Sequence, residues 1–224
     1  MKIIFINLKV QIIIMEALTN IFSRRCVRAY EKRIVEFEKL TNILDAGRLA
    51  PSAGNVQDWK FIVVTDEEKL DQLNNAAIEQ DWINSAPLAI IICSEPIKEE
   101  RMYGVRGKDL YSVQNASCAA ENMLLAAHAQ GLGGCWIGAF DEITIRDLFK
   151  IPETVIPRTI LTFGYPAEKI WDKPKFSLYD VTFFNVWNNK VKDNKEFYKL
   201  FKKVTDYWKE KVKKLREHLP GKNF

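Results

Sequence analysis

The chain has 224 residues, 47% of them hydrophobic and 28% charged, with ten glycines and eight prolines. This composition is typical of a globular protein and excludes a disordered, collagen-like or low-complexity chain. The net charge of +4 is concentrated in the tail, because residues 190–224 hold 12 Lys and Arg against 5 Asp and Glu, while the remaining 189 residues have a net charge of −3.

The first stretch of the chain, residues 1–14, is apolar. Lys9 and Gln11 interrupt it, no small-residue cleavage site follows it, and it is too short to span a bilayer. We therefore interpret it as an extra strand or as a mis-set start, with Met15 as the true start, in preference to a signal peptide or a membrane anchor.

Helices are predicted where apolar residues recur every three or four positions, and strands where short runs of β-branched and aromatic residues occur. In chain order we expect helices at 16–23 and 36–49, a loop at 51–57, a strand at 59–65, a helix within 66–84 and a strand at 88–93. We then expect a long helix at 112–130 capped by Gly131, a strand or extended segment at 135–137, a short helix at 141–149, a strand at 158–163 and a long charged helix at 197–219. Strands and helices do not alternate strictly, which favours an α+β fold with a sheet covered by helices.

An arginine cluster follows the first predicted helix. Arg24, Arg25 and Arg28 fall within five residues, and a guanidinium group matches the oxygens of a phosphate. The segment alone fits both a phosphate-binding seat and a solvated basic turn.

A polar loop at 51–57 leads into the strand that begins at Trp59. Ser52, Asn55 and Gln57 offer small donors and acceptors at the edge of a rigid strand, which suits recognition of a planar heterocycle. The residues alone leave an ordinary surface loop as the alternative.

Glycines cluster at 131–138, in the sequence GLGGCWIG. A dinucleotide-binding fingerprint has its glycines between a strand and the start of a helix, and here the helix comes first. We therefore predict a helix cap and a close backbone approach at these glycines, and no Rossmann-type NAD(P) site.

The cysteines have no zinc-ligand spacing, since there is no C-x-x-C pair and only two histidines could join them. We expect no metal site, and reduced thiols in a cytoplasmic protein. The four are Cys26, Cys93, Cys118 and Cys135.

Four motifs in order resemble the FMN-dependent nitroreductase family: RRCVRAYE at 24–31, APSAGNVQDWKFIVV at 50–64, LYSVQNASCAAENMLLAAHAQGLGGCWIGAF at 110–140 and LTFGYPAEK at 161–169. The resemblance covers the chain from Phe22 to Val181. It implies a central antiparallel or mixed sheet flanked by helices, in an intertwined homodimer whose two FMN molecules lie in the subunit interface.

The resemblance implies that the segment after the first helix holds the FMN phosphate and ribityl chain, through Arg24, Arg25, Cys26 and Arg28. Cys26 stands where the family often has Ser, and a thiol is the weaker donor. Lys173 and Lys175 match basic positions that return to the phosphate. Two or three of these five cations suffice for a phosphate, which carries about −1.5 to −2 charge.

In the family, the isoalloxazine ring is approached by the polar loop, partly from the other subunit, and by the strand after the glycines. The residues implied here are Pro51, Ser52, Ala53, Asn55 and Gln57 of the loop, Trp136, Ile137, Gly138 and Ala139 after the glycines, and Gln80 by a loose match. Tyr103 and Arg106 are candidates for gating the substrate or meeting an NADPH phosphate, with a surface lead-in to the long helix as the alternative. No side chain is assigned as general acid or base, because the flavin carries the redox chemistry.

The resemblance implies an NAD(P)H-dependent FMN oxidoreductase. It would transfer hydride through flavin N5 to a nitroaromatic, a quinone or a similar small acceptor, by a ping-pong scheme. One alternative is a narrow-purpose flavin enzyme of the same fold, for dehalogenation, for enoyl or heterocycle reduction, or for a flavin-consuming reaction. The other is a basic interaction module that uses the C-terminal helix.

We divide the chain into the extension at 1–14, an FMN-binding domain at 15–181 and a C-terminal helical arm at 182–224. The arm has one apolar stripe, at Phe197, Phe201, Val204, Trp208, Val212, Leu215 and Leu219, with lysines elsewhere. The aromatic residues lie on the stripe and not among the lysines, which argues against nucleic-acid binding. The resemblance implies an arm that docks on the partner subunit, and we expect no membrane partner, with a basic amphipathic helix at a membrane surface as the alternative.

Overall fold

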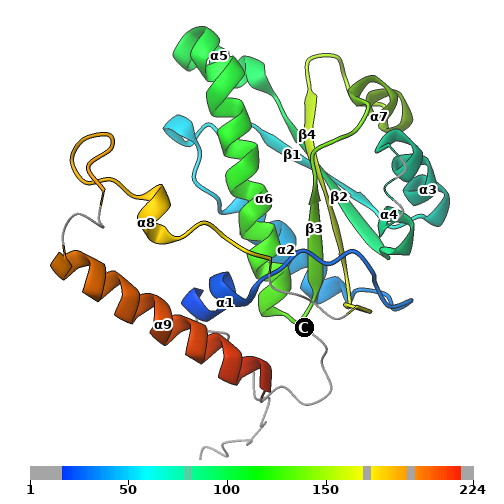
Figure 1. Ribbon diagram of the computed structural model, residues 1–224. Coiled ribbons are helices and arrows are strands. Elements are labelled where there is room, and N and C mark those ends of the chain that lie inside the picture. The colour runs from blue at the N-terminus through cyan, green and yellow to red at the C-terminus, as the bar shows by residue number, and fades with distance from the viewer. Residues whose placement is uncertain (1–16, 79, 81, 169–172, 191–194, 218–224) are drawn as a thin grey trace, which may run out of the picture.

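The computed structural model describes residues 17–78, 80, 82–168, 173–190 and 195–217. Four antiparallel strands form one sheet in the order β1-β2-β4-β3 (Figure 1). The strands are β1 (Trp59–Val64), β2 (Leu88–Ser94), β3 (Gly133–Ile137) and β4 (Ile156–Gly164). The predicted α+β fold is confirmed, while the predicted extension at 1–14 lies outside the described residues.

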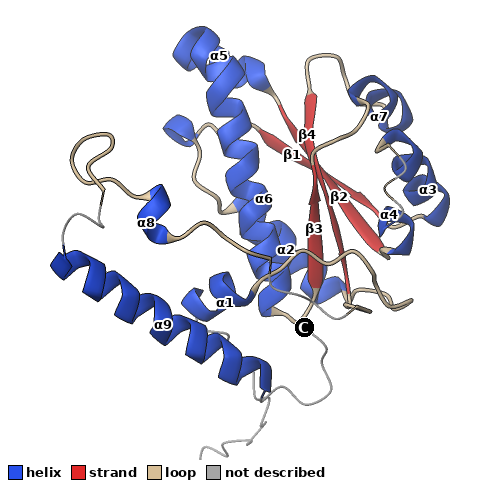
Figure 2. Ribbon diagram, viewed as in Figure 1, coloured by secondary structure: helices blue, strands red, loops and turns tan. Residues whose placement is uncertain are grey.

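Helices cover both faces of the sheet (Figure 2). On one face lie α2 (Phe37–Arg48) and α6 (Ser112–Ala129), and on the other lie α3 (Glu67–Ala76), α4 (Trp82–Ser85) and α7 (Glu142–Phe149). The remaining helices lie outside these two layers: α1 (Ala17–Ser23), η1 (Ala53–Asn55), α5 (Pro96–Arg106), η2 (Gly107–Tyr111), α8 (Leu178–Val181) and α9 (Lys195–Glu217).

The sequence of β2 explains why helices cover both faces of the sheet. All seven of its residues are buried, and successive side chains of a strand point to opposite faces. Ile90 and Ile92 therefore join the core beneath α2 and α6, while Ile91 and Cys93 join the core beneath α3 and α7. An unbroken apolar run is what a central strand with both faces covered requires.

Two helix ends show regular capping chemistry. Asp66 accepts the N–H of Lys69 at 2.9 Å, which begins α3. After α6, Gly131 has a φ of 77° and Leu132 N–H donates to Ala127 O. This geometry is that of a glycine cap, so the predicted cap at Gly131 is confirmed.

The segment between β2 and α6 differs from the prediction. We expected residues 103–107 to be a surface lead-in as one alternative, whereas the structure has α5 and η2 there, continuous with α6. Ile97 and Met102 are exposed on α5, and Gly104 has a φ of 62°. The helix therefore lacks the regular apolar face by which a sequence pattern reveals a helix.

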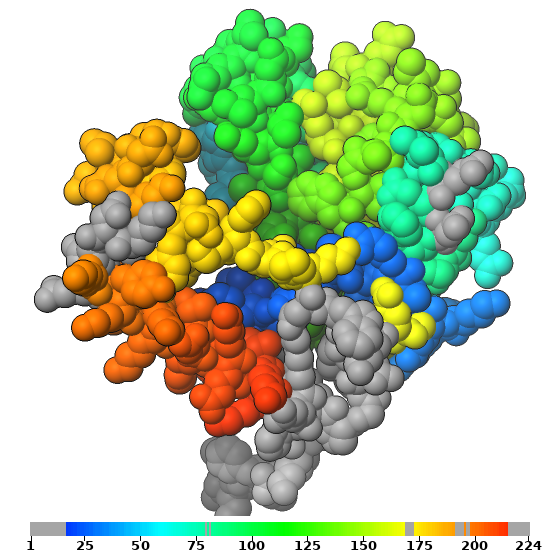
Figure 3. Space-filling view, in the orientation of Figure 1, coloured from blue at the N-terminus to red at the C-terminus, as the bar shows by residue number. Residues whose placement is uncertain are grey.

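The long helix of the arm lies beside α1 (Figure 3). Trp208 contacts Phe22 of α1 with ring centres 4.9 Å apart, and Phe201 lies 6.4 Å from the ring of Tyr179 in α8. Of the predicted apolar stripe, the side chains of Phe197, Leu215 and Leu219 lie outside the described residues. The predicted helix is confirmed, and its docking on a partner subunit stays a prediction. None of the described helices is both long and apolar enough to cross a membrane.

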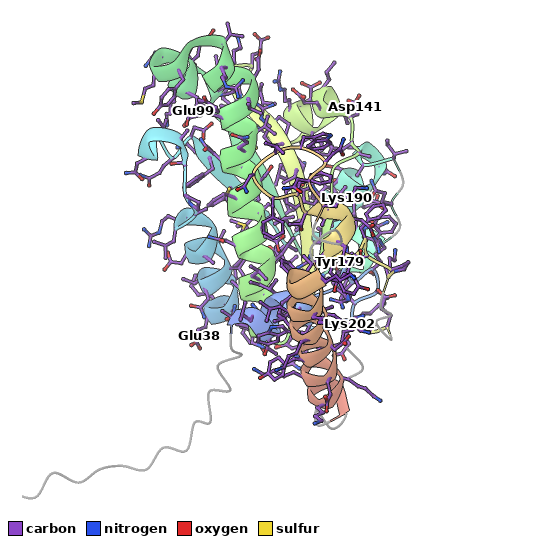
Figure 4. All side chains as sticks on the ribbon, turned by 60° about the vertical axis from the view of Figure 1, so that its left-hand side comes forward. Glu38, Glu99, Asp141, Tyr179, Lys190 and Lys202 are labelled. Carbon is purple, nitrogen blue, oxygen red and sulfur yellow. The ribbon has the colours of Figure 1, made fainter. Side chains whose placement is uncertain are left out.

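A buried polar network ties the loop before β1 to the helices above it. Asn115 of α6 donates through Nδ2 to Asp58 Oδ1 at 2.7 Å and to Glu99 Oε1 at 2.6 Å, and its Oδ1 accepts Ala53 N–H at 2.9 Å. All three side chains are buried, and Figure 4 shows Glu99 at the end of the molecule where α5 meets α6. Within the described part of the chain, the second oxygen of each carboxyl group has no hydrogen-bond partner.

Burial sets the protonation of this network. It raises the pKa of Glu99, with help from the charge of Asp58 and against the hydrogen bond from Asn115. A proton on Glu99 relieves the repulsion between two buried carboxylates that share one amide.

Replacement of Asn115 by alanine is expected to lower the free energy of unfolding by about 3 kcal/mol, because it strands two buried carboxyl groups and one backbone N–H. The matched control is Asn122→Ala on the same helix, which loses one hydrogen bond at 3.0 Å to Ala46 O and should cost about 1 kcal/mol. Urea unfolding followed by circular dichroism measures both. An equal loss of unfolding free energy in the two variants would contradict the role assigned to Asn115.

Replacement of Glu99 by glutamine should make stability less dependent on pH. A carboxyl group whose pKa is raised in the folded state stabilises the protein fully below its unfolded-state pKa of about 4.3. That contribution is lost as the pH rises through the folded-state pKa. Glutamine stays neutral, so the stability of Glu99→Gln relative to the unchanged protein should increase from about pH 4 towards neutrality. Urea unfolding at a series of pH values tests this, and a difference that does not vary with pH counts against it.

Candidate functional site

The arginine segment lies along the start of β3. Cys26 and Gly134 form a parallel bridge, and Val27 N–H donates to Gly134 O at 3.1 Å. Val27 is buried, Cys26 is exposed, and the three arginines on either side are half-buried. One apolar anchor therefore fixes a segment whose basic groups stay near the surface.

The glycines of β3 allow this close approach. A Cβ on Gly133 would lie 2.5 Å from Val27 Cγ2, and a Cβ on Gly134 would lie 2.8 Å from Leu124 Cδ2. Real Cβ atoms essentially never come so near to other heavy atoms. The predicted close backbone approach is confirmed, and its partners are the arginine segment and α6.

The guanidinium groups are held in place by their own chain. Arg24 Nε lies 3.6 Å from Glu121 Oε1 of α6. Arg25 Nη1 donates to two backbone carbonyls, at 2.8 and 2.7 Å. Arg28 stacks over the ring of Trp82, with Cζ 5.3 Å from the ring centre. Preorganised guanidinium groups lose less entropy when they bind a phosphate than free ones do.

The motif GYPAEK returns to this segment. Ala167 N–H donates to Ala29 O at 2.9 Å, and Arg28 N–H donates to the carboxylate of Glu168. Three guanidinium groups thus lie near two carboxylates, Glu121 and Glu168, which leaves a positive excess suited to an anion. Lys173 and Lys175 follow the motif and are exposed, and their part in anion binding stays a prediction.

Two cysteines lie on the paired segments, Cys26 exposed and Cys135 buried. A hydrogen bond from the Cys135 thiol lowers the pKa of Cys26, and the charges of Arg24 and Arg28 lower it further against the effect of partial burial. The same hydrogen bond and burial raise the pKa of Cys135. The exposed thiol at the arginines is therefore the acidic one of the pair.

The far end of β3 carries the residues expected beside the flavin ring. Trp136 is 37% exposed and Ile137 is buried, whereas Gly138 and Ala139 are exposed. Gln80 Nε2 donates to Ala139 O at 2.9 Å, so the loose match to Gln80 falls in this group. Gly133 and Ile137 are about 13 Å apart along the strand, which suits an elongated ligand with its anionic end at the arginines.

The polar loop forms a separate group. Ser52 Oγ accepts Gln57 N–H at 3.1 Å, and Gln57 Nε2 donates to Asn55 Oδ1 at 3.1 Å. Gly54 has a φ of 53°, and a Cβ there would lie 2.2 Å from Tyr103 Oη. The loop is thus a rigid turn with Tyr103 packed upon it.

Arg106 belongs to the same group as Tyr103. Its Nε lies 3.2 Å from Tyr111 Oη, and the rings of Tyr103 and Tyr111 meet edge to face at 5.4 Å. Both residues expected at a lid therefore lie with the loop and not with the arginines.

Helix α6 separates the two groups. Figure 1 shows η1 of the polar loop on one side of α6 and β3 on the other, and the turned view of Figure 4 agrees. One chain brings together the arginines, Cys26, Gln80 and the residues at 136–139. It does not bring Pro51, Ser52, Ala53, Asn55 or Gln57 to them.

The sequence reasoning gave no role to Asn115, Glu121 or Glu168, which hold the site's elements in place. Asn115 carried a signal, because it is a polar residue on the alanine-rich face of α6 that packs on the sheet. Glu121 and Glu168 lie inside the third and fourth family motifs, far in sequence from their partners Arg24 and Arg28. No local sequence pattern indicates a pair between such distant residues.

Known proteins resemble this chain over most of its length. The family model described as "Nitroreductase family" matches residues 21–105 and 77–165. A protein of Methanothermobacter thermautotrophicus, provisionally described as an NADH dehydrogenase/NAD(P)H nitroreductase, is 40% identical over 158 residues, which are 69% of this chain and 79% of that protein. The FMN reductase (NADPH) of Bacillus subtilis is 24% identical over 214 residues, which are 88% of this chain and 85% of its own.

A solved structure supports the same family. The FMN-dependent nitroreductase of Clostridium difficile superposes with a TM-score of 0.67 and 32% identity, over 76% of this chain and 99% of its own. The family match includes the arginine segment, the polar loop, α6 and β3. On sequence and on fold, the chain belongs to the nitroreductase family.

Proposed function

We propose that the chain is an NAD(P)H-dependent FMN oxidoreductase that reduces a small acceptor, such as a nitroaromatic or a quinone, by a ping-pong scheme. The observation that carries this proposal is the pairing of the arginine segment with β3, which puts three guanidinium groups at one end of the strand and the exposed backbone of 138–139 at the other. When bound, FMN supplies the hydride chemistry. The descriptions of the relatives as NAD(P)H nitroreductase and FMN reductase support the assignment.

The residues of the chain would bind FMN and orient it. Arg24, Arg25 and Arg28 would hold the phosphate through charge-assisted hydrogen bonds. Gln80 fixes the carbonyl of Ala139 and so steadies the backbone that would border the ring. No side chain of the chain is required as general acid or base.

We further propose a homodimer with two shared sites. The polar loop and the arginine segment of one chain lie on opposite sides of α6, so a loop that reaches the cofactor would belong to the second copy. The loop is exposed at Asn55 and Gln57, which leaves it available for this contact. All four cysteines are free thiols, which supports a cytoplasmic location.

The test is the flavin content and oligomeric state of the purified full chain. We expect a yellow dimer with one FMN per chain, which oxidises NADH or NADPH when a nitroaromatic or quinone is supplied. A colourless protein that takes up no FMN on reconstitution contradicts the proposal. A yellow monomer contradicts the shared site alone.

Replacement of Arg28 by alanine should weaken FMN binding by about tenfold to hundredfold, since a hydrogen bond to a charged group contributes about 1.5–3 kcal/mol. Arg28→Lys keeps the positive charge but loses the two parallel N–H donors of the guanidinium group. Its dissociation constant for FMN should therefore lie between those of the unchanged protein and Arg28→Ala. Arg48→Ala is the control, because Arg48 is exposed and pairs only locally with Asp45 at 3.0 Å. Flavin fluorescence titration measures the three dissociation constants, and equal values for Arg28→Ala and Arg48→Ala would exclude Arg28 from the phosphate site.

A further inference from the structure

The short helix α4 packs against the arginine segment at two points. Ala86, which follows the helix, is buried in one small core with Val27 and Tyr30. Trp82, four residues earlier, carries the guanidinium group of Arg28 over its ring, with Cζ 5.3 Å from the ring centre. Residues four apart lie on the same face of a helical turn, so one face of α4 supports the arginine segment.

The core of the molecule holds α4 in place. Ile83 is buried in the cluster beneath α3 and α7, and Trp82 is half-buried against the same cluster. Ser85 Oγ donates to Trp82 O at 2.9 Å. Gln80, which precedes the helix, donates to Ala139 O at 2.9 Å. The indole ring is therefore presented from a fixed base, and the same stretch of chain steadies the carbonyl at the other end of the site.

The three arginines differ in how far the protein itself uses their donors. Arg24 lies beside a carboxylate, since its Nε is 3.6 Å from Glu121 Oε1. Arg25 Nη1 donates to two carbonyls of its own segment. Among the described residues, no oxygen accepts a hydrogen bond from the guanidinium group of Arg28, which contacts the face of Trp82 instead. Within that part of the chain, all five N–H donors of Arg28 remain for an anion.

An aromatic ring orients an arginine without using its donors. The ring attracts the cation through its face, whereas a carboxylate occupies two parallel N–H groups and neutralises the charge. Trp82 thus restricts the positions of the Arg28 side chain and leaves its hydrogen-bonding edge open. A side chain that is ordered in advance loses less entropy when it binds a ligand.

The indole N–H of Trp82 supports this role of the ring face. Nε1 is buried and has no hydrogen-bond partner within the described part of the chain, although a buried indole usually has one. The polar atom of Trp82 therefore adds no contact that a plain aromatic ring would lack.

We infer that Arg28 is the principal phosphate ligand of the FMN site and that Trp82 is the residue that positions it. This inference rests on the proposed function, because it takes the arginine segment as the seat of the FMN phosphate. It adds which of the three guanidinium groups binds through its parallel donors, and which side chain holds that group ready. Arg24 and Arg25 contribute mainly charge.

The experiment measures dissociation constants for FMN on the full chain by flavin fluorescence titration. Trp82→Leu removes the aromatic face and keeps an apolar side chain against the core. We expect FMN binding to weaken about threefold to tenfold, because the side chain of Arg28 must then be ordered on binding. Trp82→Phe keeps a ring and should stay within about twofold of the unchanged protein. Trp82→Met, which fills more of the indole volume, carries the same expectation as Trp82→Leu and replaces it where that variant does not fold.

Two readouts separate the positioning of Arg28 from a general loosening of the structure. In the Arg28→Ala background, Trp82→Leu should weaken FMN binding no further, since its effect acts through Arg28. Riboflavin has no phosphate, so Trp82→Leu should leave its dissociation constant unchanged. The matched control is Ile83→Val, which removes one buried methyl group from the same helix and should bind FMN as the unchanged protein does.

The rank of the arginines is tested in the same titration. Arg24→Ala and Arg25→Ala should each weaken FMN binding less than Arg28→Ala does, because their donors are partly used within the chain. A larger loss in either variant overturns the assignment of Arg28 as the principal ligand.

An unchanged FMN affinity in Trp82→Leu overturns the positioning role. An equal loss in Ile83→Val, a further loss on top of Arg28→Ala, or a parallel loss of riboflavin binding also overturns it, since each indicates a structural role alone. Flavin uptake by the unchanged protein separates the two proposals. A protein that takes up no FMN contradicts the proposed function and this inference with it, whereas a yellow protein whose Trp82→Leu variant binds FMN equally well contradicts this inference alone.

Discussion

The site depends on one close contact, that between Val27 and the glycines at the start of β3. Val27 is buried against Gly133, where no Cβ fits, and its N–H binds Gly134 O. This contact fixes a short charged segment that has no regular secondary structure of its own. The positions of the three arginines, of Cys26 beside Gly134 and of the returning GYPAEK motif all follow from it.

Helix α6 imposes the second constraint, because its length and burial separate the arginine side of the chain from the polar loop. Asn115 fastens the loop to α6 on one side, and Leu124 packs on Gly134 on the other. The helix thus holds both halves of the proposed site rigidly and keeps them apart. In the homodimer that we propose, the second copy would supply the half of the site that α6 keeps apart in one chain.

The sequence predicted the elements whose own pattern is strong. The run at β2 and the apolar face of α6 come from local residues, and both were found where expected. Helix α5 was not predicted, because its exposed apolar residues and Gly104 obscure the period of a helix. The arginines were found as a cluster, but the ion pair of Arg24 with Glu121 depends on the packing of α1 against α6, which no local pattern encodes.

The charge of the site also explains why one atom at position 26 matters. The sequence resemblance implies a serine at this position in many members of the family, and a serine hydroxyl stays neutral among arginines at any ordinary pH. A thiol ionises in the same surroundings, because the field that favours a phosphate favours a thiolate equally. In the proposed phosphate site, sulfur in place of oxygen would exchange a hydrogen-bond donor to the phosphate for an anion that competes with it.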